Sequence, residues 1–256
     1  MAIIVENVIL PFSELQIPSW QAPKRGLYGV VGPNGSGKSQ FFSLLYRGLK
    51  VHQGTVILQE RVGCVMQHPE HQLTESSVAN EILWAFKGKK RSDAKFRQRV
   101  DRVVWRWQLD SMWNQSPWTL STGQKRRVVL AVYDLLNPDV LLVDEPTEGL
   151  DKFWKEELKK WLIAKKSSRL VLIISHDWPW MLSFVDNGFW CEKILDGTAK
   201  DLGSLWYHHT LSAKSPLEEL WRELIKRNAP VSFRGWIGSE RALQQVVELW
   251  TQVRTK

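Results

Sequence analysis

The sequence predicts an α/β fold in which a mostly parallel sheet is covered by helices. Residues 3–10, 27–31, 55–58 and 61–66 read as strands, and a helix-like run follows a glycine-rich loop at residues 40–45. Residues 139–144 are apolar at nearly every position, which is typical of a parallel strand buried on both faces. From residue 138 to 205 strand and helix patterns alternate, and this alternation indicates a parallel sheet.

The glycine-rich loop matches the pattern G-x-x-x-x-G-K-[ST] over its full length. Its glycines let successive backbone N–H groups point into one concavity, to which the following helix adds the positive end of its dipole. Lys38 would reach the β- and γ-phosphates, and the Ser39 hydroxyl would bind Mg²⁺. A chance glycine-rich turn is the alternative. The predicted nucleotide site comprises Gly32, Pro33, Asn34, Gly35, Ser36, Gly37, Lys38, Ser39 and Gln40.

Two carboxylates, Asp144 and Glu145, end the apolar run that begins at residue 139. A carboxylate at the carboxyl end of a strand beside a phosphate loop can hold Mg²⁺, directly or through water. Asp144 is therefore predicted as a metal ligand, and Glu145 is left to act on the attacking water. A strand followed by an acidic turn would give the same local pattern.

Four further segments occur in an order that identifies a family. Residues 120–124 (Leu-Ser-Thr-Gly-Gln) resemble the signature L-S-G-G-Q of the ATP-binding-cassette (ABC) ATPases, and residues 64–69 resemble their Q-loop. Residues 148–151 resemble the D-loop, and residues 170–177 resemble the last core strand with its switch histidine. Taken singly, Gln67 would be a loop amide and His176 a structural histidine. The complete set in one order favours the ABC ATPases.

Parts of these segments resemble one subgroup in particular. Residues 67–73 resemble the F-Q-N-P-D-D-Q-L stretch of the energy-coupling-factor and cobalt-type importer ATPases. Residues 123–128 and 146–151 fit the G-G-Q-K-R-R-V and P-T-A-G-L-D segments of the same subgroup. Thr122 departs from the family, because it stands where the signature has a glycine. A β-branched residue there restricts φ and lies near the facing nucleotide.

The resemblance also implies an architecture. It implies a P-loop NTPase core in a nucleotide-binding domain over residues 1–205, with an antiparallel β subdomain and a helical signature subdomain at about residues 70–137. Residues 206–256 are predicted to form a small helical C-terminal extension, since residues 215–218 are a capping box and an apolar stripe follows. In the subgroup such an extension often helps to pair subunits. Docking on its own domain is equally compatible with the stripe.

The roles that the resemblance implies require ATP and Mg²⁺. Glu145 would polarise the water, His176 would contact the γ-phosphate or that water, and Gln67 would join Ser39 and Asp144 at the metal. The signature would close over the ATP of a second chain, and the residues implied there are Ser121, Gly123, Gln124 and Asp151. Phe12 stands about where the family places its adenine-stacking aromatic, although a Phe at a strand end could equally belong to the core.

Two classes of function remain open. The first is the ATP-hydrolysing subunit of an energy-coupling-factor type importer of a vitamin or a transition-metal ion, peripheral at the cytoplasmic face of the cell membrane. Its implied partners are a second ABC ATPase subunit, paralogous or identical, an integral-membrane coupling subunit and a substrate-binding membrane subunit. The alternative is a soluble ABC ATPase that acts on nucleic acid, the ribosome or a metallocluster scaffold. Neither a long coiled-coil insertion nor a tandem second cassette is found, which favours the importer.

Composition adds limits to the class of protein. A chain of 256 residues with 43% hydrophobic content can bury a sizeable core. No apolar run approaches the roughly 20 residues that span a bilayer. Residues 1–6 lack the basic region and cleavage site of a signal peptide, so none is expected. Cys64 and Cys191 are too few for a disulfide framework and are predicted to be buried reduced thiols.

The basic residues and the tryptophans each allow two interpretations. The net charge is +8, and its densest stretch begins at residues 87–91 and continues through Lys95, Arg97, Arg99 and Arg102. This stretch could contact nucleic acid or an anionic membrane. We favour a solvated helix face and expect no nucleic-acid partner, because no recognisable binding module accompanies the charge. The 15 Trp residues recur at apolar spacing, as Trp105 does with Leu109 and Trp113, which predicts core or subunit contact.

Overall fold

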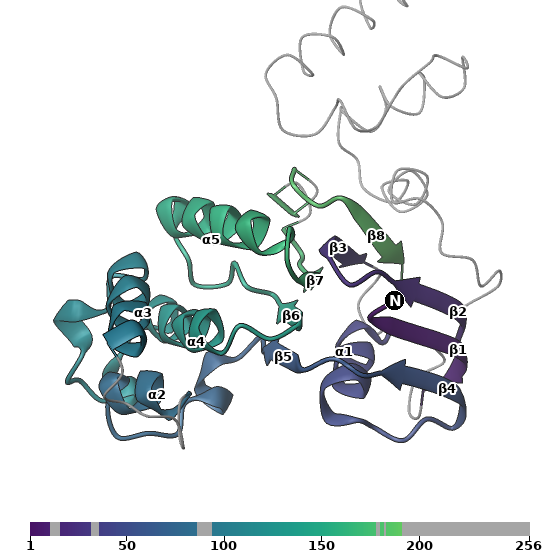
Figure 1. Ribbon diagram of the computed structural model, residues 1–256, viewed down its shortest axis with the longest axis horizontal. Helices are drawn as coiled ribbons and strands as arrows, with labels where there is room; N and C mark the ends of the chain where they lie inside the picture. Colours follow the sequence, from purple (N-terminus) through teal and green to yellow (C-terminus); the bar gives the residue numbers. More distant parts are fainter. Residues whose placement is uncertain (11–15, 32–35, 86–93, 178–179, 182, 191–256) are drawn as a thin grey trace, which may run out of the picture.

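The computed structural model describes residues 1–10, 16–31, 36–85, 94–177, 180–181 and 183–190. Figure 1 shows a parallel sheet in the middle of the molecule, an antiparallel sheet at one end and a group of helices at the other. The predicted C-terminal helices, Phe12, Cys191 and the basic residues 87–91 lie outside the described residues. The mixed α/β fold class that the sequence predicts is confirmed.

The central sheet consists of five parallel strands in the order β5-β6-β7-β3-β8. Their bounds are Gly26–Val31 for β3, Val62–Val65 for β5, Val140–Asp144 for β6, Leu170–Ile174 for β7 and Asn187–Trp190 for β8. Strand β6 is buried on both faces. Successive side chains of a strand point to opposite faces, so neighbouring residues of β6 pack against different parts of the molecule. Val140 and Leu142 pack with α1 and the antiparallel sheet, whereas Leu141 and Val143 pack with the helices on the other side. Two-sided burial explains the continuous apolar run.

The antiparallel sheet has the order β2-β1-β4, with β1 at Ile3–Ile9, β2 at Gln16–Ala22 and β4 at Gln53–Leu58. Strand β2 is absent from the strands that the sequence predicts. It contains Pro18, which has no N–H to donate and is tolerated in a strand only at an edge or a bulge. Strand β2 lies at the edge of the antiparallel sheet and pairs with β1 on one side. An edge strand can contain a residue such as Pro18, and the sequence pattern therefore does not reveal it as a strand.

Residues 69–136 form a helical lobe that contains no strand in its described part. It holds α2 (Val78–Trp84), α3 (Ala94–Arg106) and α4 (Thr122–Leu136), together with the short turns η1 (Pro69–Gln72), η2 (Asp110–Met112) and η3 (Pro117–Thr119). Arg99 of the basic stretch and Arg106, which follows it, connect α3 to α4: Arg99 donates to Leu135 O at 2.8 Å and Arg106 pairs with Asp134 at 2.7 Å. Arg97 and Arg102 are exposed, as expected of a solvated helix face.

Core contact, one of the two outcomes predicted for the tryptophans, is confirmed for Trp107 but not for Trp84, Trp105 or Trp118, which are exposed. Trp107 is buried and lies 5.5 Å from Trp161 and 6.3 Å from Trp154, between ring centroids. Trp105 is 78% exposed. Helix α3 buries Val103 and Val104 instead, and a residue one position further along is rotated by about 100° away from that face. The spacing to Leu109 is misleading because α3 ends at Arg106.

Two helices flank the parallel sheet on opposite sides. Helix α1 (Lys38–Arg47) buries Phe41, Phe42, Leu44 and Leu45 against the face shared with the antiparallel sheet. Helix α5 (Lys152–Lys165) buries Leu158, Trp161 and Leu162 against the opposite face. No helix in the described part of the chain is long and apolar enough to cross a membrane.

The junction of β1 and β4 provides a test of the antiparallel sheet. Gly54 has φ +95°, and a Cβ at this position would collide with the carbonyl oxygen of Asn7. Gly54→Ala should therefore destabilise the chain by about 3 kcal/mol, from left-handed strain plus overlap with backbone. Gly48→Ala is the matched control, because Gly48 also has a positive φ but no atom lies within 4 Å of the place that a Cβ would take.

Urea denaturation of the two variants separates strain from collision. Gly48→Ala should cost only about 1 kcal/mol of unfolding free energy. Equal losses in the two variants would show that the β1–β4 backbones do not approach as closely as described.

Candidate functional site

The carboxyl ends of the parallel strands converge on one cavity. Its volume is ≈ 380 Å³, and its lining residues are Gly37, Lys38, Ser39, Gln40, Gln67, Asp144, Glu145, Ile174 and His176. Strand β6 ends at Asp144, β7 ends at Ile174 just before His176, and Gln67 follows β5. Ligands bind at this edge of an open α/β sheet, because the loops that leave parallel strands all lie there. The predicted residues Lys38, Ser39, Gln67, Asp144, Glu145 and His176 are thus brought together.

The part of the phosphate loop that the structure describes leads directly into α1. Gly37 caps the helix, and its carbonyl oxygen accepts a hydrogen bond from Phe41 N–H at 2.8 Å. Ser36 Oγ and Gln40 Oε1 are buried and have no hydrogen-bond partner among the described residues. Buried polar atoms are normally paired, so these two atoms favour a polar ligand at the helix N-terminus. Gly32, Pro33, Asn34 and Gly35 lie outside the described residues.

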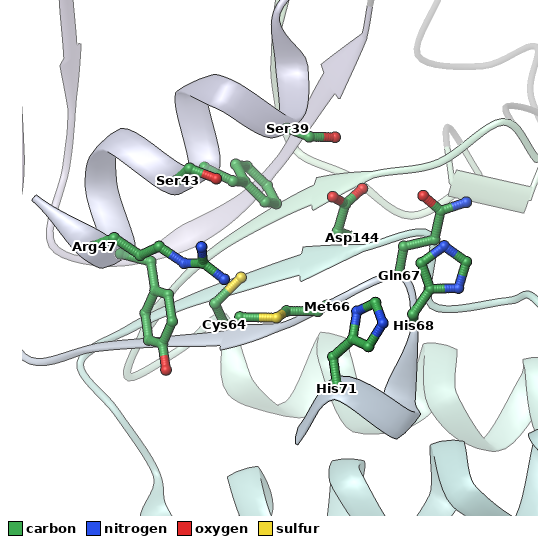
Figure 2. Close-up of a pocket in the computed structure, with 11 residues that line it drawn as sticks. Ser39, Ser43, Arg47, Cys64, Met66, Gln67, His68, His71 and Asp144 are labelled. Carbon is green, nitrogen blue, oxygen red and sulfur yellow. The ribbon is translucent and has the colours of Figure 1, made fainter. Parts of the chain in front are cut away.

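Oxygen donors for a cation come from three separate elements. The Ser39 hydroxyl of α1 hydrogen-bonds to the Asp144 carboxylate, and Gln67 contributes a side-chain amide to the same cavity. These three residues also line a second, smaller hollow beside the cavity, which Figure 2 shows. Burial raises the pKa of Asp144, and the Ser39 hydrogen bond and the Lys38 charge oppose this. A set of hydroxyl, carboxylate and amide oxygens suits Mg²⁺.

Glu145 has an unusual backbone and a half-satisfied carboxylate. Its φ is 46°, in the left-handed region, and its N–H donates to Ile174 O at 2.9 Å. Oε2 accepts the backbone N–H of His176 at 2.9 Å, whereas Oε1 is buried without a hydrogen-bond partner and lies 3.5 Å from His176 Nε2. Glu145 is thus held at one oxygen, and its other oxygen is able to accept a proton from water.

The signature residues lie outside this cavity, at the start of α4. Ser121 and Gln124 form a capping box, in which Ser121 N–H donates to Gln124 Oε1 at 2.8 Å and Gln124 N–H donates to Ser121 Oγ at 3.3 Å. Asp151 caps α5 by accepting Trp154 N–H at 2.9 Å. Ser121 and Asp151 are exposed, so neither is brought to the cavity of its own chain.

Two glycines let the signature contact the segment after β6. A Cβ on Gly123 would overlap the carbonyl oxygen of Gly149, and a Cβ on Gly149 would lie 3.1 Å from the Thr122 methyl group. Thr122 therefore packs over Gly149 within the chain.

Three residues that support the site are absent from the sequence prediction. Arg126 is fully buried and donates to the main chain of Met66 and Gln67. Gln72 accepts Met66 N–H at 2.8 Å and donates to Cys64 O at 2.7 Å. Glu81 accepts the N–H groups of residues 74 and 75. For Arg126 a signal existed, because helical spacing to Leu130 and Tyr133 places it on the buried face.

The hollow in Figure 2 adjoins the main cavity and has a volume of ≈ 200 Å³. It shares Ser39, Gln67 and Asp144 with that cavity and is also lined by Cys64 and Met66. Cys64 is free and buried, as predicted, and burial raises the pKa of its thiol to about 12. A thiol that stays protonated is a poor nucleophile and a poor metal ligand.

Comparisons with known proteins agree on one family. The family model for ABC transporters matches residues 15–148. A putative ABC transporter ATP-binding protein of Clostridium perfringens is 32% identical over 200 residues, which cover 70% of each chain. The energy-coupling factor transporter ATP-binding protein EcfA2 of the same species is 31% identical, again over 70% of each chain.

A solved structure shares the fold. It is cbiO1 of Clostridium perfringens, described as part of the ABC transporter complex cbiONQ, and it is 23% identical with a TM-score of 0.68. The match covers 88% of this chain and 94% of that chain.

The cavity predicts a specific role for Lys38. Lys38→Ala should weaken ATP binding by roughly 10- to 100-fold, because a bound polyanion loses a charged hydrogen-bond donor beside the loop. Equilibrium titration with a fluorescent ATP analogue in the presence of Mg²⁺ is the measurement.

Lys159→Ala is the control for Lys38→Ala. It removes the same charge from α5, where Lys159 donates to Ser183 outside the cavity. If both variants bind the analogue as tightly as the unmutated chain, the loop is not the phosphate cradle.

Proposed function

The chain belongs to the ABC transporter family of ATPases, and from this premise we propose that it is the ATP-hydrolysing subunit of an energy-coupling-factor type importer. One observation carries the catalytic part of the proposal: eight predicted residues from four separate segments line one cavity. These are Gly37, Lys38, Ser39, Gln40, Gln67, Asp144, Glu145 and His176.

Hydrolysis requires neutralisation of the γ-phosphate charge and a water in line with the bond that breaks. Lys38 and the N-terminus of α1 supply positive charge at the phosphates. Glu145 accepts the proton of the attacking water through Oε1, while the His176 N–H holds Oε2. The His176 imidazole, which is largely exposed at the cavity, contacts the γ-phosphate or orients the water.

The donor set also supports Mg²⁺ as the cofactor of this ATPase. Ser39, Asp144 and Gln67 would hold the ion, which supplies charge neutralisation between the β- and γ-phosphates when bound. Ser39 and Asp144 line the same cavity, where their oxygens are available to one ion.

Two chains are required in this proposal, because the signature does not reach its own cavity. Ser121, Gly123 and Gln124 stand at the start of α4, where the capping box fixes their backbone. In a head-to-tail pair they would close over the ATP of the partner, with the α4 N-terminus adding its dipole. Asp151 would lie at the same interface. The partner is an identical chain or a paralogue, and we favour a paralogue.

Transport requires membrane partners that the described residues do not supply. We place the chain at the cytoplasmic face of the membrane, bound to a coupling subunit and a substrate-binding subunit. The support is the similarity to an energy-coupling factor ATPase and to part of a cbiONQ complex.

Glu145→Gln tests the catalytic assignment. The amide keeps the shape and can still accept the His176 N–H, but it cannot take a proton from water. Turnover should fall by roughly 10²- to 10⁴-fold while ATP binding persists. The measurement is phosphate release by the full chain assembled with its partners, beside an equilibrium binding titration.

Glu157→Gln is the control for Glu145→Gln, since Glu157 pairs with Lys160 on α5 outside the cavity. Its turnover should stay close to that of the unmutated chain. Turnover by Glu145→Gln at the unmutated rate would rule out Glu145 as the base.

The shared site makes activity depend on concentration. The isolated chain should lose activity per subunit on dilution, because each cavity then lacks the signature of a partner. Specific activity is measured against subunit concentration, with sedimentation to follow association. Restoration by an added second ATPase subunit would identify the partner, whereas constant activity from a demonstrated monomer would contradict the two-chain model.

A further inference from the structure

We propose that Arg126 is a positioning residue that holds the main chain at Gln67 and so joins α4 to the metal side of the cavity. This inference rests on the proposed function, since it concerns the same site. Arg126 does not line the cavity, and it hydrogen-bonds to Gln67 through the main chain, so its effect would be exerted through Gln67.

Among the described residues, Arg126 donates hydrogen bonds to two successive carbonyl groups. Nη1 donates to Met66 O at 2.6 Å, and Nη2 donates to Gln67 O. The residue is 0% exposed, and its Nε is buried without a hydrogen-bond partner. A planar guanidinium can bind two neighbouring acceptors at once in a fixed direction, which a lysine ammonium does less well.

A buried cation that binds carbonyls needs compensating charge from elsewhere. The carboxylates that interact electrostatically with Arg126 are Glu148, Glu70, Asp144 and Glu145. Two of these belong to the cavity itself. The buried charge of Arg126 is therefore compensated in part by carboxylates of the site. A purely apolar side chain of similar size would fill the same space but would carry no charge to be compensated.

Gln67 is positioned from both sides of its peptide. On the preceding residue, Met66 N–H donates to Gln72 Oε1 at 2.8 Å. Arg126 acts on the carbonyls, and it alone of these contacts comes from the helix that carries the signature. Figure 2 shows Gln67 beside Asp144, so a shift of this peptide moves an amide relative to the cation donors.

The placement of Arg126 on α4 links two functions. Ser121 caps α4, and Arg126 stands little more than one turn further along the same helix. A helix is stiff over this distance, so a rotation of α4 that moves the signature also pulls on Gln67. The signature serves the nucleotide of the second chain, whereas Gln67 serves the cavity of its own chain.

The test measures metal affinity in Arg126→Met and Arg126→Lys. The full chain with a non-hydrolysable ATP analogue is titrated with Mn²⁺, and free Mn²⁺ is followed by electron paramagnetic resonance. Arg126→Met should weaken Mn²⁺ binding by about 10-fold or more, as expected when an outer partner of a ligand is lost. Arg126→Lys should lie between, because it keeps the charge and at least one donor.

Arg127→Met is the matched control. Arg127 is the next residue of α4 and also donates to two carbonyls, at 2.9 Å to Trp107 O and 3.2 Å to Gln108 O, but not to Gln67. The Arg127→Met variant should have a lower melting temperature than the unmutated chain but the same Mn²⁺ affinity. Metal-free binding of the analogue should be unchanged in all variants, since the described hydrogen bonds of Arg126 go to Met66 and Gln67 and not to the phosphate loop.

Each other outcome overturns the inference. Unmutated Mn²⁺ affinity in Arg126→Met would show that Arg126 only supports the fold. If Arg126→Met does not fold, unchanged affinity in Arg126→Lys would lead to the same conclusion. Failure of the unmutated chain to bind the analogue with Mn²⁺ would overturn the proposed function as well, and it is distinguishable because it appears without any substitution.

Discussion

In a parallel sheet the carboxyl ends of all strands lie at the same edge of the sheet, and the described cavity depends on this constraint. Asp144, Gln67 and His176 are far apart in the sequence, yet each stands at or just after the carboxyl end of a strand of the same sheet. The strands β5, β6 and β7 are adjacent, so the residues after them become neighbours. Burial of both sheet faces then fixes the strands, because movement of one would open gaps on two sides.

The rest of the molecule modifies this edge rather than creating it. The antiparallel sheet and α1 fill one face of the parallel sheet, and α5 with the helical lobe fills the other. The lobe reaches the cavity through Arg126 and Gln72, which both hydrogen-bond to the main chain of residues 64–67. The lobe also shares one hydrophobic cluster with this face of the parallel sheet, so the hydrogen bonds to residues 64–67 add a polar connection to an apolar one.

Local patterns are enough to select residues that line one cavity, because these residues belong to short segments with their own chemistry. The loop at Lys38 and the carboxylates after β6 are recognisable without knowledge of the fold. The failures are non-local. The conformation of strand β2 depends on its pairing with β1. The exposure of Trp105 depends on where α3 ends, and the role of Arg126 depends on carbonyls about 60 residues away in the chain. Single-residue spacing carries no information about such distant partners.

The left-handed backbone at Glu145 implies a compromise between durability and chemistry. A side chain at φ 46° carries strain that glycine would avoid, of order 1–2 kcal/mol. A Gly or Asn at this position would relax the main chain but remove the carboxylate that faces the cavity. Sequences selected only for thermal resistance would therefore be expected to abandon Glu145 first, so heat-tolerant variants of this chain are a natural place to look for lost turnover.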